Sequence, residues 1–292
     1  MNTATQILVS GLTLGAMYAI STVSLSLVWG ALNVLNMAQG ALLTLGGYFA
    51  YAAVSSLGFP PLAAILITVA LGGIVGLIMY LAVIRQMLDA DGFEVNVIIA
   101  TVGIGTVIEN LMQKVFGAYP IRQPIMWEGG FFIGRTHVPY NSVVIVVASI
   151  GLMMTLAAVL TRTRMGRAIR AVSQNREAAQ LMGVPVQLVY AQVLLVAGAL
   201  SAASGVMLST ITTLSPTMGY DPMLKAFIIC VIAGLGNIAG ALYAAFTLGV
   251  FEALVQFVFG VRFAFPAMLL IVILALIWRP YGVFGRKKVS RL

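Results

Sequence analysis

Residues 62–84 read LAAILITVALGGIVGLIMYLAVI and contain no charged side chain. About 20 apolar residues are enough for a helix to cross the hydrocarbon of a bilayer. The run does not alternate between apolar and polar residues, as a strand of a membrane barrel would. Helices and closed barrels are the structures that satisfy their own backbone hydrogen bonds in lipid. The run therefore predicts a transmembrane helix.

The rest of the chain has the same character. Of its 292 residues, 61% are hydrophobic and 8% are charged, and the mean hydropathy is +1.05. A soluble domain carries about 25% charged residues, so this chain cannot cover its surface in water. The composition predicts an all-α integral membrane protein, with residues 1–292 forming a single transmembrane domain.

Nine crossings are expected on this basis. They lie at about 6–29, 38–57, 61–84, 95–117, 141–161, 188–212 and 264–278, with two more inside 223–260, where a glycine-rich segment interrupts the apolar run. Nine crossings place the N-terminus outside. If the segment near 33–47 is re-entrant, there are eight and the N-terminus is inside. Both alternatives stay open. The polar stretch 118–140 is expected to be an external loop.

The net charge of +8 is concentrated beside the spans. One interhelical loop, about 162–187, holds Arg162, Arg164, Arg167, Arg170 and Arg176; the C-terminus holds Arg279, Arg286, Lys287, Lys288 and Arg291. Positive charge next to membrane spans marks the cytoplasmic side. Both segments are therefore expected in the cytoplasm, and the charge does not indicate binding to nucleic acid.

Enzyme activity is not expected. His137 is the single histidine, and the sequence has neither a G-x-S-x-G nor a phosphate-binding G-x-x-x-x-G-K-[ST] motif. Gly234-x-Gly236-Asn237 is one residue short of the G-x-G-D of intramembrane aspartyl proteases, but asparagine cannot supply the carboxylate that a paired-acid mechanism needs. No metal or cofactor is predicted.

The arginine-rich loop contains a short amphipathic helix. Ala178, Leu181 and Met182 fall on one face, Asn175 and its polar neighbours begin the helix, and Gly183 followed by Pro185 ends it. A helix of about two turns is not stable alone, so it must dock against something. The alternative is a basic loop that lies on anionic lipid. On the pattern alone, both stay open.

Three segments, in order along the chain, resemble the branched-chain amino acid permeases of bacterial ABC importers, the LivH-like family. The first is Asn33-Val-Leu-Asn36-Met-Ala-Gln39-Gly40, the second is Arg170-Ala171…Asn175…Ala178-Ala179…Leu181-Met182-Gly183-Val184, and the third runs from Lys225 through Gly234-Leu-Gly236-Asn237-Ile-Ala-Gly240. Ala233 stands where the family pattern has glycine, which affects the backbone geometry expected there.

The resemblance implies a permease subunit of the bacterial inner membrane. The residues implied to couple to a separate ATPase are Arg170, Ala171, Asn175, Glu177, Ala178, Ala179, Leu181, Met182 and Gly183; a structural glycine motif comprises Gly234, Gly236, Asn237 and Gly240. The implied partners are the ATPase subunits, a periplasmic solute-binding protein and a second permease chain, for which a related chain is favoured over a second copy. Branched-chain amino acids are the expected solute; urea, short amides and aromatic acids are carried by similar permeases.

Polar residues within the apolar runs are candidates for the solute path, because charge in hydrocarbon is costly and usually faces a cavity. They are Glu109 and Asn110, Glu252, and the group Asn33, Asn36 and Gln39 at an expected helix break. The alternative for each is a hydrogen bond that fixes helix packing. Asp221 and Lys225, spaced i, i+4, are expected to form a local ion pair.

A rival function uses some of the same residues. An ion-coupled secondary transporter could bind cations at Glu109 and Glu252 and would work without an ATPase. The two hypotheses differ in whether this chain transports solute alone.

Overall fold

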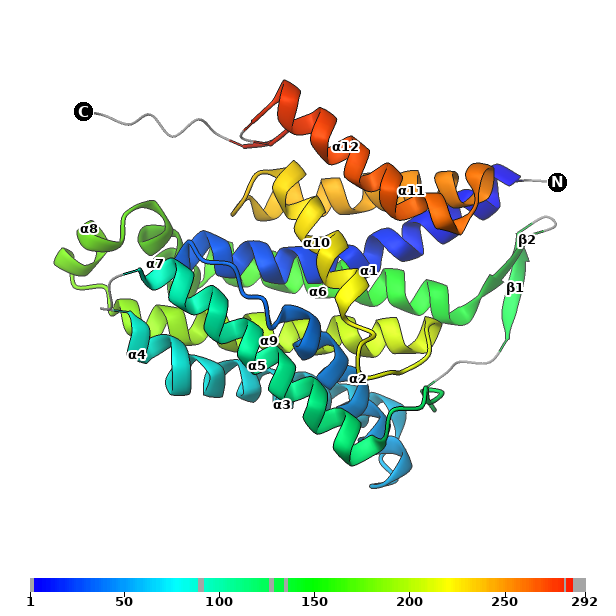
Figure 1. Ribbon diagram of the computed structural model, residues 1–292, viewed down its shortest axis with the longest axis horizontal. Coiled ribbons are helices and arrows are strands. Elements are labelled where there is room, and N and C mark those ends of the chain that lie inside the picture. Colours follow the sequence, from blue (N-terminus) through cyan, green and yellow to red (C-terminus); the bar gives the residue numbers. More distant parts are fainter. Residues whose placement is uncertain (1–2, 89–91, 126–128, 134–135, 281, 286–292) are drawn as a thin grey trace.

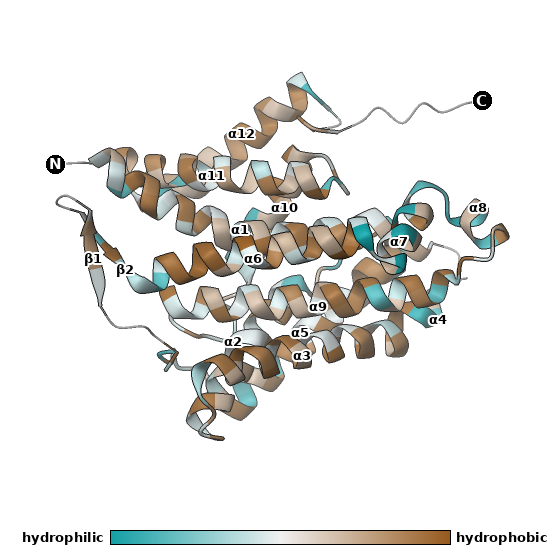
Figure 2. Ribbon diagram, turned by 180° about the vertical axis from the view of Figure 1, so that it is seen from behind, coloured by the Kyte–Doolittle hydropathy of each residue, from teal (hydrophilic) through white to brown (hydrophobic). Residues whose placement is uncertain are grey.

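The computed structural model describes residues 3–88, 92–125, 129–133, 136–280 and 282–285. Long helices run side by side along its longest axis (Figure 1). Helices α7 and α8 lie at one end, called here the α8 end. A two-stranded hairpin and the N-terminus lie at the other, called here the hairpin end. Apolar residues cover most of the long helices, and hydrophilic ones gather at α7 and α8 (Figure 2).

Helices form nearly all of the described structure. In chain order they are α1 (Thr3–Leu32), α2 (Gln39–Ser55), α3 (Pro61–Met79), a π-helical turn η1 (Tyr80–Ile84), α4 (Arg85–Met87), α5 (Phe93–Phe116), α6 (Tyr140–Arg162), α7 (Arg164–Gln174), α8 (Arg176–Leu181), α9 (Val186–Ile211), α10 (Tyr220–Ala233), α11 (Ile238–Phe259), η2 (Val261–Phe263) and α12 (Ala264–Trp278). The hairpin pairs β1 (Gly130–Ile133) with β2 (Thr136–Pro139). It occupies the predicted external loop, of which Trp127, Glu128 and Arg135 lie outside the described residues.

Seven helices in the described part of the chain are long and apolar enough to cross a membrane. They correspond to seven of the nine predicted crossings, and an all-α polytopic membrane protein is confirmed. The other two predicted crossings are shorter helices, α2 with 17 residues and α10 with 14. At 1.5 Å per residue, α10 is about 21 Å long, less than the roughly 30 Å of hydrocarbon. The number of membrane crossings, eight or nine, stays a prediction.

The same set of helix contacts occurs twice in the bundle. Helix α3 packs on α9, and α11 packs on α1; α2 packs on α9, α3 and α5, while α10 packs on α1, α11 and α12. Helices α1 and α9 run in opposite directions between the two ends (Figure 1). The contacts therefore relate α1–α2–α3–α5 to α9–α10–α11–α12 as an inverted repeat, an arrangement common in transporters.

The two short helices meet at their N-terminal ends. The Gly219 amide, just before α10, donates to Thr44 Oγ1 of α2 at 3.1 Å. A Cβ atom on Gly40 would lie 2.9 Å from the Gly219 carbonyl oxygen. Both glycines are buried. The two short helices α2 and α10 thus touch inside the bundle, and they occupy equivalent places in the two repeats.

Glycines also set the contacts between the long helices. A Cβ on Gly198 of α9 would overlap the Gly72 carbonyl of α3, and a Cβ on Gly249 of α11 would overlap Gly15 of α1. Lipid provides no hydrophobic drive for helices to associate, so close backbone contact has to hold them together. Small residues recur at a spacing of four in these spans, as in Gly11 and Gly15 or Gly72 and Gly76, and such backbone contacts explain them.

Substitution of Gly205 by alanine is expected to destabilise the fold by about 1–3 kcal/mol, because the added methyl group would overlap the Leu43 carbonyl oxygen of α2. Gly151→Ala is the matched control. Gly151 is exposed on α6, and there is open space where its Cβ atom would lie, so alanine there should be neutral or stabilising. Thermal unfolding in detergent measures both; equal losses for the two variants would contradict this explanation of the packing.

Candidate functional site: an exposed short helix and an open polar face

Helix α8 begins and ends at the residues that the sequence predicted. The Asn175 side chain accepts a hydrogen bond from the Ala178 amide at 2.9 Å, which caps the first turn. Gly183 has φ +81°, a conformation that glycine adopts without steric cost. The Val184 amide returns to the Ala179 carbonyl at 3.0 Å. The predicted short amphipathic helix is confirmed.

The apolar face of α8 points away from the bundle. Leu181 is 88% exposed and Met182 is 84% exposed. Ala178 is exposed beside them, whereas Ala179 is buried and holds the helix against the bundle. Large apolar side chains that stay this exposed at one end of a membrane protein mark a surface for another molecule.

The other predicted coupling residues lie next to this face. Arg170 and Ala171 belong to α7, and the Arg170 guanidinium donates to the Leu160 carbonyl in the last turn of α6. Glu177 and Gly183 are exposed at the two ends of α8. Arg170 thus has a structural role in this state, since it satisfies a carbonyl that the end of α6 leaves free.

Helix α7 was not predicted from the sequence. The segment was expected to be part of a loop, but Arg164–Gln174 forms a helix that Thr163 caps by accepting a hydrogen bond from the Gly166 amide at 3.1 Å. Gly166, Ile169 and Val172 form its buried face. Their spacing of three residues indicates a helix with one buried face, but the arginines on the opposite face made the segment look like a polar loop.

The glycine motif forms the turn between α10 and α11. Gly234 and Gly236 have φ +89° and +82°, so the chain reverses where two left-handed residues fall close together. Asn237 Oδ1 then accepts from the Gly240 amide at 2.9 Å and caps α11, while Asn237 Nδ2 donates to the Phe284 carbonyl at 2.9 Å. Ala233, where the resemblance predicted glycine, is fully buried at the end of α10.

Loss of both Asn237 hydrogen bonds should lower the stability of the protein by a measurable amount. Asn237→Ala is expected to lower the free energy of unfolding by about 1–2 kcal/mol, because a helix cap and a second hydrogen bond are lost. Asn237→Ser keeps an oxygen for the cap but has no amide donor for Phe284. Thermal unfolding should place the serine variant between wild type and alanine; a serine variant as unstable as alanine would show that the cap contributes nothing.

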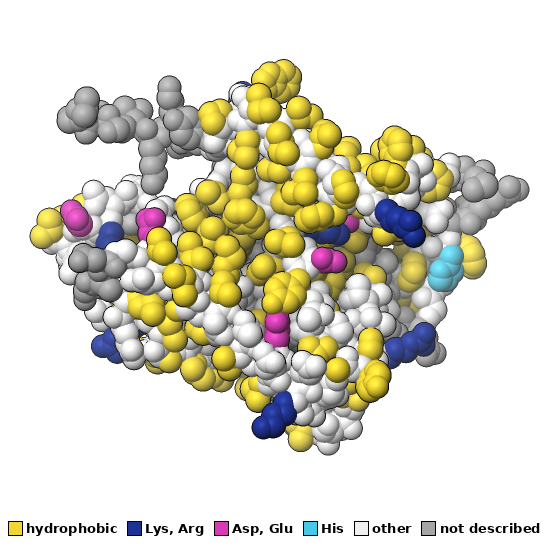
Figure 3. All heavy atoms as spheres, viewed as in Figure 1, with side chains coloured by type: hydrophobic (Ala, Val, Ile, Leu, Met, Phe, Trp, Pro, Cys, Tyr) yellow, Lys and Arg dark blue, Asp and Glu magenta, His cyan; other side chains and the backbone are white. Residues whose placement is uncertain are grey.

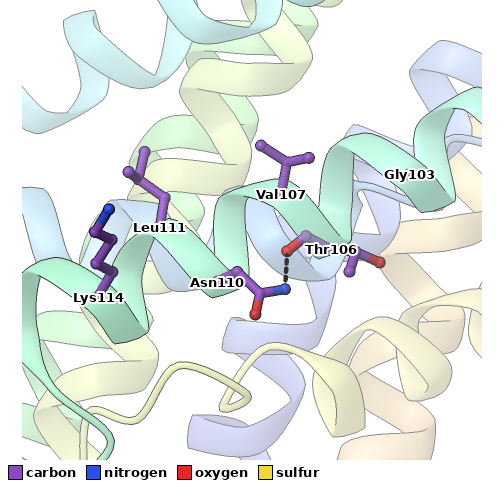
Figure 4. A pocket seen from close by; sticks show the side chains of 6 residues that line it. All are labelled: Gly103, Thr106, Val107, Asn110, Leu111 and Lys114. Carbon is purple, nitrogen blue, oxygen red and sulfur yellow. Dashed lines mark hydrogen bonds between the residues drawn. The ribbon is translucent and has the colours of Figure 1, made fainter.

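An open face of the bundle carries several polar groups. It is the face in front in Figure 1, and two acidic side chains stand near its middle among hydrophobic ones (Figure 3). Glu109 of α5 accepts a hydrogen bond from the Tyr220 hydroxyl of α10 at 2.9 Å. A shallow, open groove lies along α5 and is lined by residues of that one helix: Gly103, Thr106, Val107, Asn110, Leu111 and Lys114 (Figure 4).

The polar residues of this groove share one side of α5. Thr106, Asn110 and Lys114 are spaced by four residues and are all exposed. Asn110 Nδ2 donates to the Thr106 carbonyl at 2.7 Å (Figure 4). An amide and an ammonium group cannot face hydrocarbon without large cost. This side of α5 is therefore a candidate for a surface that faces water or another protein.

The residues predicted at the helix break lie between α1 and the first turn of α2. Asn33 has φ +58° and donates from Nδ2 to Glu94 at 3.2 Å. Asn36 is buried and its Oδ1 accepts from the Ala38 amide at 3.0 Å. Gln39 is fully buried and donates to Ser201 of α9 at 2.7 Å. The predicted break is confirmed: Asn36 bonds within its own turn, and Gln39 attaches the start of α2 to α9.

Glu252 lies in a buried charge cluster formed by α1, α10 and α11. Lys225 Nζ donates to Glu252 Oε1 at 2.6 Å and to the Tyr18 hydroxyl at 2.9 Å. Gln256 Nε2 donates to the same carboxylate oxygen at 3.0 Å. The predicted local pair of Asp221 with Lys225 is wrong, because Lys225 pairs with Glu252 of α11. A buried carboxylate needs a cationic partner more than the exposed Asp221 does.

The family comparison agrees with the resemblance found in the sequence. The profile of the family described as "Branched-chain amino acid transport system / permease component" matches residues 7–283. The high-affinity branched-chain amino acid transport system permease protein BraD of Pseudomonas aeruginosa is 27% identical over 98% of this chain and 97% of its own. LivH of Escherichia coli K12 is 24% identical over 97% and 96%.

A more distant relative is the fructose import permease protein FrcC of Rhizobium meliloti, 27% identical over 75% of this chain and 62% of its own. No solved structure matches the chain. The predictions of a transport subunit that is not an enzyme, and of a multi-pass membrane protein, are confirmed. The chain belongs to the branched-chain amino acid transport system permease family, as a permease subunit of an ATP-binding-cassette importer.

Proposed function

We propose that this chain imports branched-chain amino acids or similar small polar solutes, driven by a separate ATPase that binds α8. The observation that carries the proposal is the exposure of Leu181 and Met182 on a short capped helix at one end of the bundle. The sequence has no phosphate-binding loop. The energy for transport therefore comes from another chain, and α8 is the surface offered to it.

The chemistry of α8 suits a docking contact. Two adjacent large side chains provide an exposed apolar surface, and the exposed Glu177 provides a charge at the start of the helix. A few buried apolar anchors with a polar rim supply most of the energy of a typical protein interface. The ATPase would supply a groove for Leu181 and Met182, and its movement on binding and hydrolysing ATP would displace α8.

The orientation follows from charge. Arg162, Arg164, Arg167, Arg170 and Arg176 all belong to the segment that forms the α8 end. The positive-inside tendency supports a cytoplasmic α8 end and an external hairpin end. The C-terminus would then be cytoplasmic; its basic residues Arg286, Lys287, Lys288 and Arg291 lie outside the described residues. A periplasmic solute-binding protein would meet the hairpin end.

The solute path is proposed along the open side of α5. Thr106, Asn110 and Lys114 line the groove there, and the Glu109–Tyr220 hydrogen bond connects it to the start of α10. These groups would face a water-filled lumen closed by a second permease chain. A related, different chain is favoured over a second copy, on the family resemblance. Asn33 would lie along the inner part of this path, the buried Asn36 and Gln39 would support it from within the bundle, and Glu252 would support α10.

The choice of solute rests on the relatives. BraD and LivH, which match almost end to end, are branched-chain amino acid permeases, and FrcC, which matches over a shorter length, is a fructose permease. The groove has hydroxyl, amide and ammonium groups beside apolar Val107 and Leu111. The largely apolar surface of this lining is compatible with the short apolar side chain of such a solute.

Reconstitution tests the proposal against the ion-coupled alternative. Proteoliposomes containing this chain with the permease, ATPase and binding protein of its gene neighbourhood should take up radiolabelled leucine, isoleucine or valine only when ATP is supplied. The chain alone should show no uptake under a sodium or proton gradient. Ion-driven uptake by the chain alone would contradict the proposal and favour a secondary transporter.

A further inference from the structure

Helix α8 is connected to α9 at one end by a short glycine turn. Gly183 has φ +81°, and there is open space around its Cβ position. Val184 and Pro185 follow, and α9 begins at Val186. A helix held only through such a turn would pivot about the glycine when pushed. A second contact, at the opposite end of α8, is needed to turn α9 with it.

Arg176 and Tyr190 make that second contact. Arg176 is the first residue of α8, and its guanidinium carbon lies 5.8 Å from the centre of the Tyr190 ring in α9. Tyr190 is only 3% exposed, one turn inside the start of α9. A guanidinium over a buried aromatic ring is attracted by the ring's quadrupole. Together with the glycine turn, this contact fixes α8 to α9 at both ends.

Movement of α9 would reach α3 directly. Gly76 of α3 would overlap the Leu194 carbonyl of α9 if it had a side chain, and Gly198 of α9 would overlap the Gly72 carbonyl. Such close packing transmits a displacement of one helix to the other. Beyond this contact, α3 continues into the π-helical turn η1, which packs against α9 near its start. Turns of this kind often mark functional positions in helices.

We infer that Arg176 and Tyr190 are positioning residues for energy coupling: their stacking converts a displacement of α8 into a joint displacement of α9 and α3. The inference rests on the proposed function, since it takes α8 as the part that the ATPase moves. Neither residue belongs to the exposed face that would touch the ATPase. Their loss should therefore leave assembly intact and weaken only the transmission of movement.

Two pairs of variants in the reconstituted complex test the inference. Tyr190→Phe keeps the ring and Tyr190→Leu removes it; Arg176→Lys keeps the cation and Arg176→Gln removes it. The leucine and glutamine variants should raise the ATP hydrolysed per solute transported by roughly threefold to tenfold. The phenylalanine and lysine variants should stay within about twofold of wild type, and the double variant Arg176→Gln/Tyr190→Leu should be no worse than either single loss.

An unchanged ratio in Tyr190→Leu or Arg176→Gln, or fully additive effects in the double variant, would overturn the inference. Arg176 is half-buried, so Arg176→Gln keeps the test decisive if Tyr190→Leu fails to fold. Co-purification distinguishes a failure of the inference from a failure of the proposed function. If wild-type chain fails to co-purify with the ATPase, the proposed function is wrong; if all variants co-purify and only the ratio changes, the coupling role of the Arg176–Tyr190 contact is supported.

Discussion

Replacement of Glu252 by alanine is expected to destabilise the protein by about 3–5 kcal/mol, because it leaves Lys225 charged and unpaired among apolar helices. Glu252 is fully buried, and the Lys225 side chain is 16% exposed. Among the described residues, the lysine would keep Tyr18 as a partner, through its hydroxyl and its ring. Thermal unfolding of the detergent-purified protein measures the loss, and yield in the membrane fraction gives a second reading.

The matched control removes both charges. The double variant Lys225→Met/Glu252→Gln keeps the volume of both side chains and leaves no unpaired ion. Replacement of a buried ion pair by neutral groups of similar size is often nearly neutral. The double variant should therefore be more stable than Glu252→Ala. If Glu252→Ala is as stable as wild type, the pair does not hold α10 against α1 and α11.

The second large effect is expected at the tip of α8. Leu181→Asp combined with Met182→Asp should lower ATP-driven transport at least tenfold, because charged side chains cannot fill an apolar groove on the ATPase. Both residues are exposed, so the fold of the permease should not change. Transport by the reconstituted complex and co-purification of the ATPase are the two measurements.

Gln180→Asp is the control for that experiment. Gln180 is exposed on the same helix but is not part of its apolar face. The substitution adds the same kind of charge while it leaves Leu181 and Met182 in place, so transport should stay close to wild type. Equal losses in Gln180→Asp and in the double aspartate variant would indicate a general charge effect in place of a docking surface.

Local features of this chain could be predicted from the sequence. Asn175 and Gly183 bound α8 because a side-chain cap and a left-handed residue act within one or two turns of the chain. Most of the long apolar runs form the expected helices, because the apolar content of about 20 consecutive residues is also a local property. The glycine motif was located correctly, although its pairing of Asn237 with Phe284 joins residues far apart in sequence.

Contacts between distant helices could not be predicted. The i, i+4 spacing of Asp221 and Lys225 suggested a local pair, but the choice of Glu252 depends on how α10 packs against α11. The shorter helices α2 and α10 meet at Gly40 and Gly219, a contact that the apolar runs 38–57 and 223–260 do not reveal. The apolar content of a segment indicates whether it lies in lipid, but it does not show which helices contact one another.

Labelling of a single thiol tests most directly whether α8 lies in the cytoplasm under an ATPase, on which the proposed transport cycle depends. The chain's own Cys230 is buried and is replaced by alanine; Met182→Cys then provides the one accessible thiol. A membrane-impermeant maleimide should label it in inside-out vesicles, and not in spheroplasts, and bound ATPase should protect it. Labelling from the outside, or full labelling in the presence of saturating ATPase, would contradict the proposed function.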